Sequence, residues 1–240
     1  VRRVLMRAVA LLLLTAILVS AQEPQPAPAP LITVPGLASG LAGGSILAQT
    51  AAQRAQELGF PSAAAEIYRE LLAAPGADRA TLTLALVSAL LDDGRIAEAA
   101  EALREYVGLR GPAWQLRAAL VAVQQGRADE ARTLAADLKS ENLPVEDRAW
   151  FHFLQGRLAD AAGDLGRARD HYEEALAAAV SETARSRFLL AREQARLRGG
   201  PADAALLDEA RRNMERLQGR KAGYGFARTY ATMLDALGRR

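Results

Sequence analysis

The stretch GRIAEAAEALREYV, residues 94–107, places a glycine ahead of an alanine-rich segment with apolar residues at regular offsets. Closely similar stretches follow as GRADEARTLAADL at residues 126–138 and GDLGRARDHYEEAL at residues 163–176. Alanine, leucine, glutamate and arginine favour helices, and glycine permits the left-handed backbone that ends one. The recurring stretch therefore predicts helices that follow glycine turns at a regular interval along the chain.

Five glycines mark the register of this repeat, at intervals of 35, 32, 37 and 37 residues: Gly59, Gly94, Gly126, Gly163 and Gly200. Five residues after each glycine lies an alanine: Ala64, Ala99, Ala131, Ala168 and Ala205. Nine residues after it lie Tyr68, Leu103, Ala135, Tyr172 and, in the last unit, Glu209. Offsets of five, nine and twelve residues share one helical face. The small residue allows a second helix to approach closely, and stacking of the hairpins is needed to bury their apolar faces.

The fourth unit, AWFHFLQGRLADAAGDLGRARDHYEEAL at residues 149–176, resembles a tetratricopeptide repeat. It carries the signature residues Gly156, Ala159, Gly163, Ala168, Tyr172, Ala175 and Leu176. The resemblance covers roughly residues 45–240, and it is weakest near 182–218, where charged residues replace small or apolar ones: Glu193, Arg196, Glu209 and Arg212. It implies an all-α fold, a right-handed α–α superhelical solenoid of about five helix-turn-helix repeats. The last segment, from residue 224, is expected to add a C-terminal capping helix. The alternative is that it is the first helix of a further unit in a longer array.

The N-terminal residues are typical of a secretory signal peptide. Arg2, Arg3 and Arg7 precede an uncharged apolar run, which ends in Val19-Ser20-Ala21. Because about 20 apolar residues are needed to cross a bilayer, this run is short for an uncleaved anchor, which is the alternative. We therefore expect a signal peptide at 1–21, a Pro/Ala- and Gly-rich linker at 22–44 and the repeat domain at 45–240. Val1 is typical of an alternative bacterial start codon, so the predicted location is the periplasm or cell envelope of a bacterium.

Composition limits the possible classes of function. The chain has no cysteine, which excludes disulfides, thiolate metal sites and a cysteine nucleophile. Without residues 1–21, 27 basic and 28 acidic side chains remain, so the basic isoelectric point gives no support for nucleic-acid binding. The remaining charge is uneven, with a net −8 over residues 22–184 and +7 over 185–240.

Residues suited to catalysis or metal binding are sparse. The sequence lacks a phosphate-binding loop, a dinucleotide fingerprint and a nucleophile elbow. Its two histidines, His152 and His171, belong to the two helices of one unit, so a metal pair is conceivable. There is no HExxH motif, however, and His152 falls at a packing position. We predict no catalytic residue, no metal site and no cofactor.

A groove is the predicted site. In the family that the chain resembles, the first helix of each unit lines a concave surface. Mapped onto this sequence, that surface contains Gln53, Leu84, Ser88, Leu91, Leu116, Leu120, Trp150, Phe153 and Arg157. A contiguous apolar surface of this kind is typical of a partner-binding site. The alternative for Trp150 and Phe153 is a place in the core between helices.

These features predict a non-catalytic scaffold that binds a peptide or helix of a partner protein in the groove. No nucleic acid and no membrane span after signal cleavage are expected, although peripheral association with the envelope is compatible with the sequence. Two alternatives stay open. The chain is the regulatory repeat arm of a longer exported enzyme, or it is a structural protein that self-assembles through its oppositely charged ends.

Overall fold

The computed structural model describes residues 37–200, 203–219 and 221–237, which contain helices joined by turns and loops and no strand. Eleven α-helices and one 3₁₀ turn follow one another: α2 (Leu37–Glu57), α3 (Pro61–Ala73), α4 (Arg79–Asp93), α5 (Ile96–Arg104), α6 (Pro112–Gln124), α7 (Ala128–Ala135), η1 (Ser140–Asn142), α8 (Val145–Ala161), α9 (Leu165–Ala178), α10 (Glu182–Gly199), α11 (Ala204–Arg216) and α12 (Lys221–Ala236). The predicted all-α class is confirmed. The predicted signal peptide at 1–21 and residues 22–36 of the predicted linker lie outside the described ranges.

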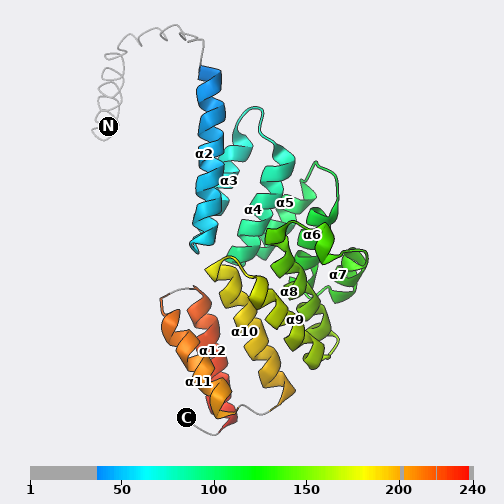
Figure 1. Ribbon diagram of the computed structural model, residues 1–240, viewed down its shortest axis with the longest axis vertical. Helices are drawn as coiled ribbons and strands as arrows, with labels where there is room; N and C mark the ends of the chain where they lie inside the picture. The colour runs from blue at the N-terminus through cyan, green and yellow to red at the C-terminus, as the bar shows by residue number, and fades with distance from the viewer. Residues whose placement is uncertain (1–36, 201–202, 220, 238–240) are drawn as a thin grey trace, which may run out of the picture. The chain divides into compact units, whose positions relative to one another are not determined.

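Packing between the helices is mainly serial (Figure 1). The pairs α4–α5, α6–α7 and α8–α9 are the hairpins that the glycine marks predict. Among the first helices of the hairpins, α4 lies against α6, and α6 lies against α8. Contacts of α3 with α4 and of α9 with α10 join successive hairpins. One continuous core results, and its buried residues run from Ala52 to Ala195.

Four of the five marked glycines end their helices with the same turn. Gly59, Gly94, Gly126 and Gly163 have φ angles of 87°, 74°, 79° and 79°. The residue after each glycine donates its backbone N–H to the carbonyl oxygen five residues earlier, at 2.8, 2.9, 2.9 and 3.0 Å. This bond closes the Schellman form of helix end, which needs a left-handed residue and so favours glycine.

The small residues that follow these turns are all buried. Ala64, Ala99, Ala131 and Ala168 have no exposed surface, and the residues four positions further on are also buried: Tyr68, Leu103, Ala135 and Tyr172. The α8–α9 hairpin shows the reason. A Cβ atom at Gly156 of α8 would lie 2.6 Å from the Tyr172 ring and 3.2 Å from the Ala168 carbonyl oxygen. The aromatic ring therefore packs directly on the backbone of the facing helix.

The fifth unit departs from this pattern. Gly200 follows the end of α10 with an extended φ of 175° rather than a left-handed one. Ala205, expected to pack, is exposed, and α11 instead buries Leu206, Leu207, Ala210 and Asn213. The packing face of α11 is thus displaced from the predicted register.

Charge explains the displacement. Asp203 caps α11 by accepting the Leu206 backbone N–H at 2.6 Å. Glu209, at the position where other units bury a tyrosine, leucine or alanine, forms ion pairs with Arg192 and Arg196 of α10 instead. A carboxylate that remains near the surface to form these pairs cannot take the place of a core residue, because burying a charge is costly.

The last two helices form a small core of their own. Leu206, Leu207, Ala210 and Met233 make a cluster separate from the main core, and α12 lies against both α11 and α10. A buried hydrogen bond joins α10 to α11, where the fully buried Glu193 accepts from Asn213 Nδ2 at 2.7 Å. Burial raises the pKa of Glu193 to about 7, although the Asn213 hydrogen bond opposes the shift.

The first described helix is longer than predicted. The chain divides into units of residues 1–40 and 41–240, and α2 begins at Leu37 in the first and continues to Glu57 in the second. Residues 37–44, assigned from the sequence to the linker, are therefore helical. Adding residues to an existing helix avoids the free-energy cost of nucleating a new one. The helix therefore includes glycines, although each disfavours helix formation by about 1 kcal/mol.

The Gly156 contact predicts opposite effects for two Gly→Ala substitutions. In Gly156→Ala the new methyl group overlaps the Tyr172 ring, so we expect the free energy of unfolding to fall by about 1–3 kcal/mol. The matched control is Gly166→Ala in α9, where the nearest atom to a new Cβ is 3.7 Å away. The control should gain up to about 1 kcal/mol from helix propensity. Urea denaturation measures both, and a Gly156→Ala protein as stable as the wild type would contradict the packing described.

The buried carboxyl of Glu193 predicts a pH dependence. Since its pKa is raised from 4.5 to about 7, the folded chain keeps this proton to higher pH than the unfolded chain. Stability is therefore expected to fall as pH rises from about 5 to 8. Asp92, whose pKa burial raises to about 6, acts in the same direction.

Glu193→Gln should remove part of the dependence of stability on pH and raise the free energy of unfolding at pH 8 by on the order of 2 kcal/mol. The groups that face Glu193, namely Arg192, Arg196, Glu209 and Asn213, stay in place in this variant. Glu215→Gln, on the exposed side of α11, is the control and should leave the profile unchanged. Thermal unfolding between pH 5 and 8 gives the comparison, and equal slopes in wild type and Glu193→Gln would disprove the assignment.

Candidate functional site

The nine residues of the predicted groove differ in exposure. Four have side chains in the core, each at most 2% exposed: Leu91, Leu116, Leu120 and Phe153. Four are partly exposed, namely Leu84, Ser88, Trp150 and Arg157. The ninth residue, Gln53, is exposed. The structure thus brings five of the nine to the surface and places the apolar middle of the predicted groove inside the protein.

Helix α10 covers part of this face. The Phe188 ring packs edge-on against Trp150, with ring centroids 5.0 Å apart, and lies 4.8 Å from the Phe153 ring. Phe153 also lies 5.9 Å from the buried Tyr172 ring of α9. Phe153 therefore occupies the interhelical core that the sequence offered as an alternative to the groove, and Trp150 lies at the edge of that core.

Arg187 of α10 reaches the C-terminal ends of two earlier first helices. Its guanidinium donates to the backbone oxygen of Asp92 at 2.9 Å and to Gln124 Oε1 at 3.3 Å. The Asp92 carboxylate accepts from Gln56 Nε2 of α2 at 2.6 Å. Burial lowers the pKa of Arg187, and the charge of Asp92 opposes this shift. Polar groups from α2, α4, α6 and α10 therefore meet in one buried region, although these helices are far apart in the sequence.

A second polar contact ties three successive first helices together. Arg117 of α6 forms a bidentate ion pair with Asp147 of α8, at 2.8 and 3.0 Å, and both side chains are nearly buried. Its Nε donates to the Leu84 carbonyl oxygen and to Ser88 Oγ of α4. Ser88, predicted to line the groove, thus supports a structural arginine.

Removal of the Asp147 charge is expected to be costly. Asp147→Asn leaves the Arg117 guanidinium almost buried without its counter-charge, so the free energy of unfolding should fall by about 3–5 kcal/mol. Asp129→Asn in α7 breaks a comparable pair with Arg132 at the surface, where Asp129 is 99% exposed. That control should change stability by less than about 1 kcal/mol. Equal effects of the two substitutions in denaturant unfolding would show that the Arg117 contact is not a structural tie.

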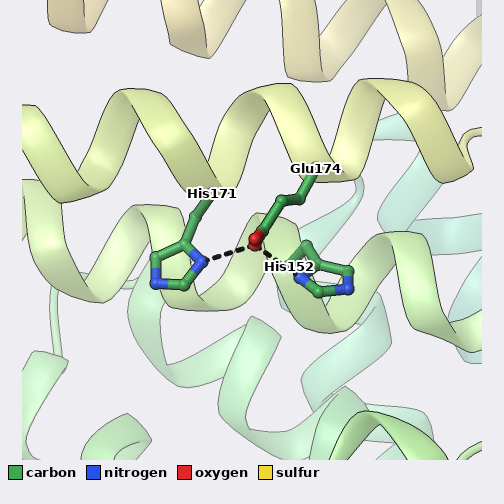
Figure 2. A group of neighbouring side chains, drawn as sticks. All are labelled: His152, His171 and Glu174. Atoms are coloured by element: carbon green, nitrogen blue, oxygen red, sulfur yellow. Dashed lines mark hydrogen bonds and ion pairs between the residues drawn. The ribbon is translucent and has the colours of Figure 1, made fainter.

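His152, His171 and Glu174 form a compact group on the α8–α9 hairpin (Figure 2). His171 Nδ1 hydrogen-bonds Glu174 Oε2 at 2.9 Å, one turn away on α9. His152 Nδ1, from α8, lies 2.9 Å from the same oxygen, at ion-pair distance but without hydrogen-bond geometry. The hydrogen bond from His171 lowers the pKa of Glu174, and the His152 charge adds to the effect.

An open hollow of about 560 Å³ lies next to this group and shares His171 with it. It is formed by α7, α8 and α9, and its lining includes Arg132, Phe151, Gln155, Asp164 and Arg167. The lining combines apolar side chains with two guanidinium groups. Both guanidinium groups form ion pairs with neighbouring carboxylates, Arg132 with Asp129 and Arg167 with Asp164, so the hollow carries charge of both signs.

Sequence reasoning noticed the two histidines but missed Glu174. The i,i+3 spacing of His171 and Glu174 was a usable signal, since such residues are neighbours on a helix. The approach of His152 depends on the rotation of α8 against α9, which the Gly156–Tyr172 contact sets. The spacing of residues along one helix does not predict how that helix is rotated against its neighbour.

No protein-family model matches the chain, and no curated protein or solved structure matches it significantly. The resemblance to tetratricopeptide repeats therefore depends on the residue pattern alone. Within the described ranges, no helix combines the length and the apolar character needed to span a bilayer.

Proposed function

We propose that the chain is a non-catalytic helical-repeat protein of the tetratricopeptide type, which binds a partner protein in the bacterial cell envelope. One observation carries the proposal. Four successive turns share the same left-handed glycine, the same closing hydrogen bond and the same buried alanine five residues later. A unit repeated in this way stacks on its neighbours, and such stacks are used mainly to present extended binding surfaces.

The proposed architecture is a right-handed solenoid of about five helix pairs with α12 as its cap. Contacts of each hairpin with the next support it, as does the α4–α6–α8 row of first helices. The polar contact between α10 and α11 replaces the apolar one of the other units, so the array is expected to be least uniform there.

The proposed binding surface is the exposed remainder of the inner face. Leu84, Trp150 and Arg157 are partly accessible there, together with the exposed Gln53. Tryptophan and arginine are frequent anchors of protein interfaces. A peptide or helix of an envelope partner is the proposed ligand. The buried Leu116, Leu120 and Phe153 are not available to it.

Site-specific photo-cross-linking tests this proposal. A photoreactive phenylalanine is placed at Gln53, Leu84 or Arg157 of the full chain in the native bacterium, and at the exposed Asp129 of α7 or Glu101 of α5 as controls. We expect the three inner-face positions to give the same discrete product in the periplasmic fraction and the controls to give none. Equal products from the control positions, or none from the inner face, would contradict the proposal. A product of twice the chain mass would favour self-assembly instead.

A further inference from the structure

We propose that His152, His171 and Glu174 bind a divalent transition metal ion of the zinc type. The three donor atoms come from two adjacent helices and all lie within 4.8 Å of one another (Figure 2). This inference does not rest on the proposed partner binding, because none of the three residues is among the proposed inner-face residues.

The donor set selects the class of metal. Two imidazole nitrogens and one carboxylate oxygen are ligands that Zn²⁺ uses, and imidazole also suits Cu²⁺ and Ni²⁺. Ca²⁺ and Mg²⁺ prefer a full shell of oxygen ligands, which this group does not provide. The site should therefore discriminate strongly between zinc and the alkaline-earth ions.

The distances from Glu174 Oε2 to the two imidazole nitrogens fit one shared ion. A metal about 2.1 Å from two donors holds them about 3.0–3.4 Å apart, for angles between 90° and tetrahedral. Glu174 Oε2 lies 2.9 Å from the Nδ1 atoms of both His152 and His171. Both imidazoles already turn the same nitrogen toward this oxygen (Figure 2), so small rotations of the side chains complete the site.

A second observation points to a ligand at this position. His152 Nδ1 is buried and has no hydrogen-bond partner, although it lies near a carboxylate oxygen. A buried ring nitrogen that lies 2.9 Å from a carboxylate oxygen without good hydrogen-bond geometry is poorly satisfied, and a coordinated metal would satisfy both atoms. A metal ion would also relieve the competition of two histidines for one oxygen.

The hairpin beneath the group holds it in place. Ala168 and Tyr172 of α9 have no exposed surface, and Tyr172 packs directly on Gly156 of α8. Donors fixed on two tightly packed helices lose little freedom when a metal binds. The site is thus largely formed before the ion arrives.

Three protein donors leave at least one coordination position for water or an external ligand, so the site differs from closed structural zinc sites. The side chains of His152, His171 and Glu174 are 24%, 32% and 53% exposed, which gives the ion access from solvent. The adjoining hollow, which His171 also lines, leaves space for an external ligand next to the ion. Reversible binding, with a dissociation constant on the order of micromolar, is expected.

Calorimetric titration of the full chain, freed of any affinity tag, with ZnCl₂ tests the proposal. The chain has only two histidines, so each imidazole contribution can be assigned by a single substitution. We expect one Zn²⁺ per chain, and affinity reduced at least about tenfold in His152→Ala, His171→Ala and Glu174→Gln. Asp170→Asn, one turn before Glu174 and exposed, is the matched carboxylate control and should bind as the wild type does. CaCl₂ and MgCl₂ should give no binding at the same concentrations.

Thermal unfolding separates loss of the site from loss of the fold. ZnCl₂ should raise the melting temperature of the wild type and of Asp170→Asn, and should leave that of the three site variants unchanged. The proposal is overturned if wild-type protein shows no saturable Zn²⁺ binding below about 1 mM. It is equally overturned if Glu174→Gln or His171→Ala, folded by circular dichroism, binds Zn²⁺ as tightly as Asp170→Asn.

Discussion

The fold depends on close contact between helices at an alanine that follows each left-handed glycine. At Gly59, Gly94, Gly126 and Gly163 the glycine ends one helix and reverses the chain, and five residues later a fully buried alanine leaves room for the neighbouring helix. Both conditions are steric. A Cβ at the turn would strain the backbone, and a larger side chain at the alanine would push the helices apart. Apolar burial then favours stacking, because no single hairpin encloses its own apolar face.

Polar contacts also hold the packed helices together. Arg117 and Asp147 tie α4, α6 and α8 together from within, and Arg187 brings α10 to the ends of α4 and α6. These contacts join elements that are distant in sequence. The face predicted as a groove is partly interior because α10 packs the Phe188 ring against Trp150 and Phe153. In the last unit, Glu193 and Glu209 replace apolar packing by ion pairs and a buried hydrogen bond.

Much of the fold could be predicted from the sequence because its determinants are local. The glycine turns and the four buried alanines follow from steric rules that act within one hairpin. The burial of Leu91, Leu116 and Leu120 could not be predicted, since it depends on how far successive hairpins rotate and on the position of α10. The His152–Glu174 approach was likewise hidden, because it joins two helices whose relative rotation is set by packing. The packing face of α11 differs from the predicted one because Glu209, a carboxylate, occupies the position where a core residue was expected.

The most direct test of the account is amide hydrogen exchange of the full chain, measured by NMR at the residue after each turn glycine. The backbone N–H groups of Phe60, Arg95, Arg127 and Asp164 each donate to a carbonyl five residues earlier, at 3.0 Å or less. If the four turns share one closed geometry within a stacked core, all four amides should exchange at least about a hundredfold more slowly than in an unfolded chain. Exchange at unfolded rates in any two of them would contradict the repeated turn on which the fold is built.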